Sequence, residues 1–155
     1  MFEDIQTRDG LTPVRINEVA HAEVALHIKF PVGYREYITK FGQGVLGGDF
    51  VRIYPPARIV RDLEEWRDRI SEYWFWDEGA DILTKENALR SIILGDTVNG
   101  DELVFHPDAP NTVMVLPRDS EKIFKAGESL PEAIEWLCNS GILTEAFGER
   151  VFVPF

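Results

Sequence analysis

Residues 91–116 read SIILGDTVNGDELVFHPDAPNTVMVL, and this stretch decides the fold. Its β-branched and other apolar residues gather in three short runs, which are Ser91–Leu94, Glu102–His106 and Thr112–Leu116. Short runs of this composition, separated by turn residues, favour β-strands. Asn99-Gly100, between the first two runs, is a strong hairpin-turn signal. Because the connections are short, we expect the strands to pair antiparallel.

Strand signals continue on both sides of this stretch. Lys122–Lys125 follows as a fourth run, after the polar turn Arg118–Ser120. Upstream, Phe50–Tyr54 reads as a strand that Pro55-Pro56 ends, since proline donates no hydrogen bond to a sheet. The glycine-rich residues 42–48 read as a flexible connection into that strand.

Two segments have clear helical periodicity. Apolar residues recur at helical spacing in the first (Tyr34, Tyr37, Ile38 and Phe41) and in the second (Leu63, Trp66, Ile70 and Tyr73). This spacing predicts amphipathic helices with one buried face each. Gly42 should end the first helix, because glycine takes the left-handed conformation that closes a helix.

Two further helices follow from their capping signals. Thr12 and Pro13 suit the start of a helix, and Phe30-Pro31 should end it. Its buried face would hold Ile16, Val19, Ala20, Glu23 and Leu26. Ser129-Leu130-Pro131-Glu132 matches a capping box. It predicts a helix that ends near Gly141 with Leu130, Ile134, Leu137 and Cys138 on one side.

The order of these elements predicts an α+β fold. We expect an antiparallel sheet of four to six strands with helices packed against it, in a single domain spanning residues 1–155. The core should occupy residues 15–140. Residues 141–155 form a tail in which Val151–Phe155 adds an edge strand, or pairs with a second copy of the chain.

The charge of −11 at pH 7 bounds the kinds of partner. Direct nucleic-acid binding is disfavoured, because such proteins carry basic surfaces that replace phosphate counterions. A basic protein partner is the better electrostatic match. One cysteine allows no internal disulfide, and the first residues lack the basic start and apolar run typical of a signal peptide. We also find no apolar run long enough to predict a membrane-spanning helix. We therefore expect a cytoplasmic protein, as a monomer or weak homodimer.

Catalytic and metal-binding patterns are missing from the sequence. Asp96 and Asp101 do not match a calcium loop, so we interpret both as turn residues. Cys138 falls on an apolar helix face, where a buried, inert thiol is expected. We expect no catalytic residue, no metal and no cofactor. The alternative is a small hydrolase or small-ligand-binding protein that uses His106 with Asp96 or Asp101.

Aromatic residues cluster after the helix that carries Trp66. Trp74, Phe75 and Trp76 are consecutive, and one helix face cannot bury all three because neighbours point about 100° apart. Acidic residues surround them. We therefore predict a partner-binding surface made of Trp74, Trp76, Asp77, Glu78 and Asp81. The alternative interpretation is that the aromatic residues pack beneath the sheet.

Several local patterns, in this order, resemble the SUKH superfamily, which includes the Smi/Knr-type regulators. They are Phe30-Pro31, Tyr34-Arg35-Glu36-Tyr37-Ile38, the glycine turn Phe41-Gly42-Gln43-Gly44, the paired turn Gly95-Asp96 with Gly100-Asp101-Glu102-Leu103, and the closing helix from Ser129 to Leu137. In this resemblance the structural turn residues are Pro31, Gly42, Gly44, Asp96, Gly100 and Asp101. The likeness spans residues 15–140.

The resemblance implies an α+β domain that binds other proteins. Many bacterial members of this superfamily are immunity proteins that neutralise a cognate toxin, frequently a nuclease, and the fungal relatives regulate cell-wall synthesis. The resemblance therefore favours a non-catalytic immunity protein that binds a basic toxin domain directly.

Overall fold

The computed structural model describes residues 1–73, 81–120 and 122–155. In chain order its elements are β1 (Gln6–Thr7), α1 (Ile16–Leu26), α2 (Tyr34–Phe41), β2 (Gly44–Leu46), β3 (Val51–Ile53), α3 (Pro56–Ser71), α5 (Lys85–Ala88), β4 (Ile92–Thr97), β5 (Glu102–His106), β6 (Ala109–Leu116), β7 (Phe124–Gly127), α6 (Leu130–Asn139) and β8 (Val151–Pro154). The fold is α+β, as the order of the sequence signals predicted.

All the strands in the described residues join one sheet, in the order β1-β8-β2-β3-β4-β5-β6-β7. Neighbours pair antiparallel except β1 and β8, which run parallel. The sheet has eight strands, so the prediction of four to six was too low. The two missed strands, β1 and β2, hold two and three residues, which is too short for an alternating pattern to be read.

The C-terminal strand lies inside the sheet. β8 pairs with β1 on one side and with β2 on the other, so the tail is a strand but not an edge strand. Phe152 is fully buried, and Phe2 near the other terminus joins the same core. The core therefore extends beyond residues 15–140. Because both edges of β8 are already paired, the tail is not open for pairing with a second copy.

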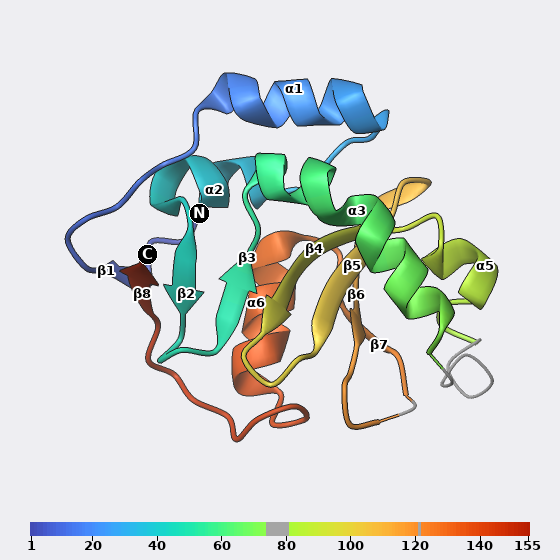
Figure 1. Ribbon diagram of the computed structural model, residues 1–155. Coiled ribbons are helices and arrows are strands. Elements are labelled where there is room, and N and C mark those ends of the chain that lie inside the picture. The colour runs from blue at the N-terminus through green and yellow to red at the C-terminus, as the bar shows by residue number, and fades with distance from the viewer. Residues whose placement is uncertain (74–80, 121) are drawn as a thin grey trace.

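Helices cover both faces of the sheet (Figure 1). Figure 1 shows α3 crossing in front of β4 and β5, with α6 behind the sheet near β6 and β7. The rings of Phe30 and Phe105 lie 6.1 Å apart. Glu102, three residues before Phe105 on β5, contacts Trp66 of α3. Side chains three residues apart on a strand point to opposite faces of the sheet. The segment leading into α2 therefore packs on the face opposite α3.

The periodic stripes of α2 and α3 are buried as predicted. Tyr34, Tyr37, Ile38 and Phe41 are all fully buried on α2, and Gly42 follows at a positive φ of 75°. On α3, Leu63, Trp66 and Ile70 are buried and Tyr73 is half-buried just beyond the helix end. A stripe of large apolar side chains thus places each helix against the sheet.

The first helix differs from its prediction. It begins at Ile16, three residues after Pro13, and Thr12 instead forms a bridge with Gly42. It ends at Leu26 because His27 takes the left-handed conformation, before Phe30-Pro31 is reached. Only Val19 and Ala22 are buried, whereas Ile16 and Ala20 of the predicted inner face are exposed.

The last helix begins as its capping box predicts, with one difference. The Ser129 hydroxyl accepts a hydrogen bond from the Glu132 amide at 3.3 Å. Glu132 reaches back to the amide of Glu128 at 2.7 Å rather than to that of Ser129. Ala133 joins the predicted apolar face of α6, which is fully buried at Leu137 and Cys138.

We predict that Tyr37→Phe stabilises the protein. The Tyr37 hydroxyl is buried without a hydrogen-bond partner among the described residues, so removing it should raise the free energy of unfolding by about 1 kcal/mol. The control is Tyr34→Phe on the same helix, because the Tyr34 hydroxyl donates to the Tyr54 carbonyl at 2.7 Å. That substitution should lower stability by about 1 kcal/mol. Urea unfolding of both variants measures the difference, and equal changes would contradict the prediction.

Candidate functional site

A row of charged side chains crosses three neighbouring strands. The register places Arg52 of β3 beside Asp96 of β4, and Asp96 beside Glu102 of β5. The Arg52 guanidinium donates two hydrogen bonds of 2.7 Å to the two Asp96 carboxylate oxygens. The Tyr54 hydroxyl donates a third of 2.7 Å. Two aligned bonds from one guanidinium fix the carboxylate in position.

Glu102 is a buried carboxylate that joins α3 to the sheet. Its oxygens accept hydrogen bonds from Trp66 Nε1 at 3.0 Å and from Arg69 at 2.9 Å. The Tyr73 hydroxyl donates to the other oxygen at 3.0 Å. The side chain is only 8% exposed. Burial of a charge is costly unless the charge is paired, and these three donors offset the cost of burying the Glu102 carboxylate.

A second charged row runs along α3. Arg58, Asp62, Glu65 and Arg69 recur at spacings of four, three and four residues, and share one stripe of the helix. They border a cavity of about 200 Å³ that also contacts Tyr54, Trp66 and Ile93. The Arg58 guanidinium lies 3.7 Å from the centre of the Tyr54 ring. Arg69 and Arg58 therefore link the helical row to the strand row.

The two rows also change the acidity of their members. Burial raises the pKa of the Tyr54 phenol well above its usual value, and the hydrogen bond to Asp96 raises it further. Hydrogen bonding to Asp96 raises the pKa of Arg52. The Arg61 hydrogen bond lowers the pKa of Asp62. The shifts of Arg52 and Asp62 hold these groups charged at neutral pH, whereas the shift of Tyr54 keeps its hydroxyl protonated as a hydrogen-bond donor. We call this surface of α3, β3, β4 and β5 the α3 face.

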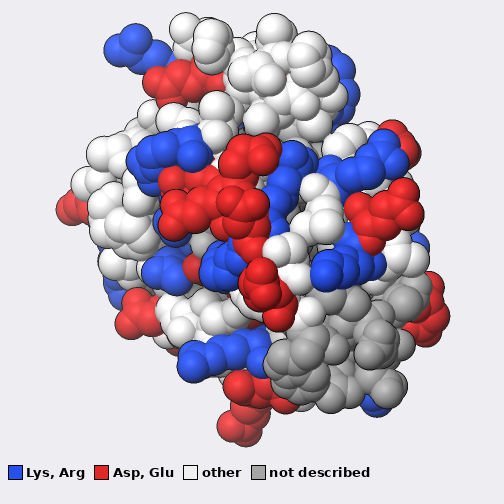
Figure 2. Space-filling view, turned by 45° about the vertical axis from the view of Figure 1, so that its right-hand side comes forward, with Lys and Arg blue, Asp and Glu red and all other residues white. Residues whose placement is uncertain are grey.

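The arginines of α3 all have partners within the chain. Arg58 and Arg61 pair with Asp62, Arg67 contacts Glu64 and two carbonyl oxygens, and Arg69 pairs with Glu102. Among the described residues the carboxylates of Glu65, Asp68 and Glu72 have no such partner. Figure 2 shows acidic and basic side chains interleaved on this side of the molecule. Its unpaired charge is therefore negative.

The partner-binding residues predicted from sequence are mostly undescribed. Trp74, Trp76, Asp77 and Glu78 lie outside the described residues, whereas Asp81 is exposed. Tyr73, which immediately precedes that segment, contacts both Glu102 and Arg69. The segment is thus joined in sequence to the α3 face.

The residues interpreted as turn residues have two different roles. Asp101 holds the hairpin, because its carboxylate accepts hydrogen bonds from the Thr97 hydroxyl and the Arg118 amide. Gly100 lies in that turn at a φ of 95°. Asp96 is not in the turn but in β4, with its carboxylate on Arg52.

The other three turn residues surround α2. Pro31 is buried just before α2, and Gly42 closes that helix. Gly44 opens β2, where a side chain would meet the Phe152 ring and the Val153 carbonyl. These positions shape the chain around the core.

The geometry does not assemble the hydrolase alternative. His106 is at the end of β5, opposite Ala109, whereas Asp96 pairs with Glu102 at the start of that strand. Four residues of strand separate these positions by roughly 13 Å. Cys138 is buried, and burial raises the pKa of its thiol. The described residues therefore do not bring the predicted base and carboxylates together.

Sequence reasoning missed the central residues of the α3 face. Arg52 alternates with the buried Val51 and Ile53, so its outward direction was readable, but its partner was not. Glu102 begins a strand whose next three residues are apolar, and a charged residue in that position is the one signal that could have drawn attention to it.

Searches of the described residues for a metal site and for a membrane-spanning helix, and a search for similar proteins, gave no match. No group of three or more His, Cys, Asp or Glu side chains within the described ranges is arranged to hold a metal ion. No helix in the part of the chain described here is both long and apolar enough to cross a membrane. No family model matches the chain, and no curated protein matches it either.

Proposed function

We propose that the chain is a non-catalytic protein-binding domain that uses its α3 face to bind a basic protein. In line with the SUKH resemblance, the proposed role is that of a bacterial immunity protein, which neutralises a cognate toxin such as a nuclease by direct contact. The observation that carries the proposal is the unpaired negative charge of Glu65, Asp68 and Glu72 beside arginines that are already paired.

The arrangement of the α3 face supports a binding role for physical reasons. Complementary charge speeds association and selects among partners. The paired rows add rigidity, since Asp96 and Glu102 each accept three hydrogen bonds from fixed donors. A surface whose side chains are fixed before binding loses less entropy when it meets its partner.

We predict that charge reversal on α3 weakens partner binding. The partner is first isolated by pull-down from the source cells and identified by mass spectrometry. The combined variant Glu65→Lys, Asp68→Lys and Glu72→Lys should then lower affinity about tenfold or more, because each exposed ion pair contributes roughly 0.2–1 kcal/mol and reversal turns attraction into repulsion. Calorimetric titration at two salt concentrations measures the loss, which should shrink as salt rises.

The control carries the same change in charge elsewhere on the surface. Asp119, Glu145 and Glu149 are exposed and belong to loops outside α3, so their triple replacement by lysine keeps the net charge equal. If both triple variants lose affinity equally, general attraction explains binding and the α3 face is not the site. A partner that is toxic when expressed alone and harmless beside the wild-type chain supports the immunity role, whereas a harmless partner would argue against it.

A further inference from the structure

Helix α1 lies at the outside of the molecule with little of its surface buried. Figure 1 shows it as the outermost helix, above α2 and α3. Of its 11 residues, only Val19 and Ala22 are buried. The sequence INEVAHAEVAL is nevertheless largely apolar. An outer helix normally shows polar residues to solvent, so the apolar content of this one is not explained by the core.

The exposed apolar residues of α1 form a ridge. Ile16 and Val24 are 62% and 74% exposed, and Ala20 between them is also exposed. They stand four residues apart, which aligns them in one row along the helix. The row is large at both ends and small at its centre. A small central residue lets a second helix approach closely.

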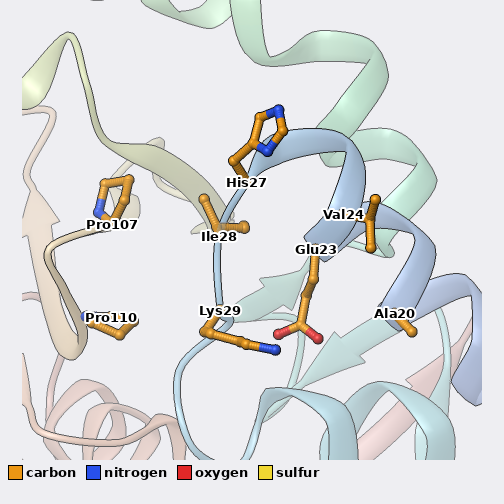
Figure 3. Close-up of a pocket in the computed structure, with 8 residues that line it drawn as sticks. All are labelled: Ala20, Glu23, Val24, His27, Ile28, Lys29, Pro107 and Pro110. Carbon is orange, nitrogen blue, oxygen red and sulfur yellow. The ribbon is translucent and has the colours of Figure 1, made fainter.

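The α1 ridge continues into a groove (Figure 3). The groove is a shallow, open depression of about 580 Å³ between α1 and the hairpin that joins β5 to β6. Its apolar walls include Ala20, Val24, Ile28, Pro107 and Pro110. Figure 3 shows Val24 and Ala20 along the helix, with Pro107 and Pro110 across the gap. The apolar surface is therefore wider than the helix alone.

The charge of this surface differs from that of the whole protein. The chain carries 27 acidic residues, yet among the described residues Glu23 is the one acid that lines the groove. Its carboxylate accepts the Phe30 amide at 2.9 Å, and Figure 3 shows Lys29 extending toward it. A second copy of an acidic chain could approach here without strong repulsion.

We propose that this surface is a homodimer interface in which α1 packs antiparallel against α1 of a second copy. A two-fold axis at Ala20 brings Ile16 of each copy opposite Val24 of the other. The large side chains of Ile16 and Val24 in one copy then pack on those of the second copy, and the two small Ala20 side chains meet at the axis. Glu23 comes opposite Asn17, so no carboxylate of the ridge meets another. A two-fold axis requires this self-complementarity of a dimer surface.

The size of the surface sets the strength of the dimer. A helix of 11 residues is roughly 16 Å long. Two such helices, together with Pro107 and Pro110 of each copy, bury less than the roughly 1,600 Å² of a standard interface. We therefore expect a weak dimer, with a dissociation constant between roughly 10 µM and 1 mM.

Sedimentation equilibrium over this concentration range tests the proposal. The wild-type chain should show a mass that rises toward the dimer. Ala20→Glu should abolish the rise, because it places two carboxylates at the axis. Ala25→Glu is the matched control, since Ala25 is exposed on the same helix outside the ridge, and it should leave the rise unchanged. A monomer at all concentrations, or equal effects of the two variants, overturns the proposal.

Cysteine cross-linking gives a second readout, because a disulfide traps the dimer covalently and reports which residues meet at the axis. The natural Cys138 is buried, so Ala20→Cys introduces one accessible thiol, at the axis. Mild oxidation should join two Ala20→Cys chains rapidly, whereas Ala25→Cys should react much more slowly. Equal rates would overturn the antiparallel arrangement. Dimerisation through α1 and partner binding through the α3 face are tested separately. A monomeric chain would leave the proposed function unaffected, and a chain without a basic partner would leave the proposed dimer unaffected.

Discussion

Glu102→Ala lowers the free energy of unfolding by about 2–3 kcal/mol, because it leaves the buried Trp66 indole N–H without its acceptor and removes the ion-pair partner of the half-exposed Arg69. The carboxylate accepts hydrogen bonds from Trp66, Arg69 and Tyr73, and all three come from α3 or the residues that follow it. Trp66 is 3% exposed, so water does not readily replace the lost acceptor for its indole N–H. We expect the loss to be seen as a lower midpoint in urea unfolding.

The comparison variant is Glu65→Ala on the same face of the molecule. Glu65 is exposed and its carboxylate has no ion-pair or hydrogen-bond partner among the described residues, so this change should stay within about 0.5 kcal/mol. Glu102→Gln should fall between the two, because an amide keeps one acceptor oxygen but loses the charge. Equal losses for Glu102→Ala and Glu65→Ala would mean that the network does not hold α3 on the sheet.

The residues of this network show where sequence reasoning stops. The helix that carries Trp66 and Arg69 was predicted correctly, because helical periodicity is a local property. The strand that begins with Glu102 was also predicted, whereas the predicted strand Ser91–Leu94 ended before Asp96, which lies in β4. The alignment of the two strands was not predicted, because register depends on the turn and on irregularities such as the shift between Ile93 and Gly95. A bulge of this kind changes which side chains face α3.

The errors at the two ends of the chain have another cause. β1 and β8 pair residues that are about 145 positions apart, as Gln6 and Val151 show. Nothing local in a two-residue strand indicates such a partner. The tail was predicted as an edge strand, yet Pro154 near its end lies beside Gly44 of β2. Proline disfavours further pairing but does not determine which strand occupies the edge.

The first helix shows that apolar composition alone does not give orientation. The sequence has apolar residues around much of this segment, so several faces fit a buried stripe. The structure buries Val19 and Ala22 and leaves Ile16 and Ala20 outside. Which face turns inward depends on α3 beneath it, and that contact is not visible in the local pattern.

Gly42→Ala should lower the free energy of unfolding by about 3 kcal/mol or more, which combines backbone strain with a steric clash. Gly42 has φ 75° and ψ −149°, a region that residues other than glycine rarely enter. A β-carbon there would lie 2.0 Å from the Thr12 carbonyl oxygen and 2.5 Å from its carbon. Both are backbone atoms, so a rotation of a side chain cannot relieve the contact. The N-terminal segment would have to move away from α2.

Gly48→Ala is the comparison variant. Gly48 also has a positive φ, of 62°, but a β-carbon there would meet nothing within 4 Å. Gly48→Ala should lower the free energy of unfolding by about 1 kcal/mol, which is the cost of a positive φ without a steric clash. Thermal and urea unfolding of both variants give the difference, which combines the clash with Thr12 and the rarer backbone conformation of Gly42. If the two substitutions cost the same, the contact between Gly42 and Thr12 is not needed for stability. A larger cost at Gly42 means that this glycine both ends α2 and joins it to the N-terminal segment, so the glycine turn has a structural reason that is independent of any partner.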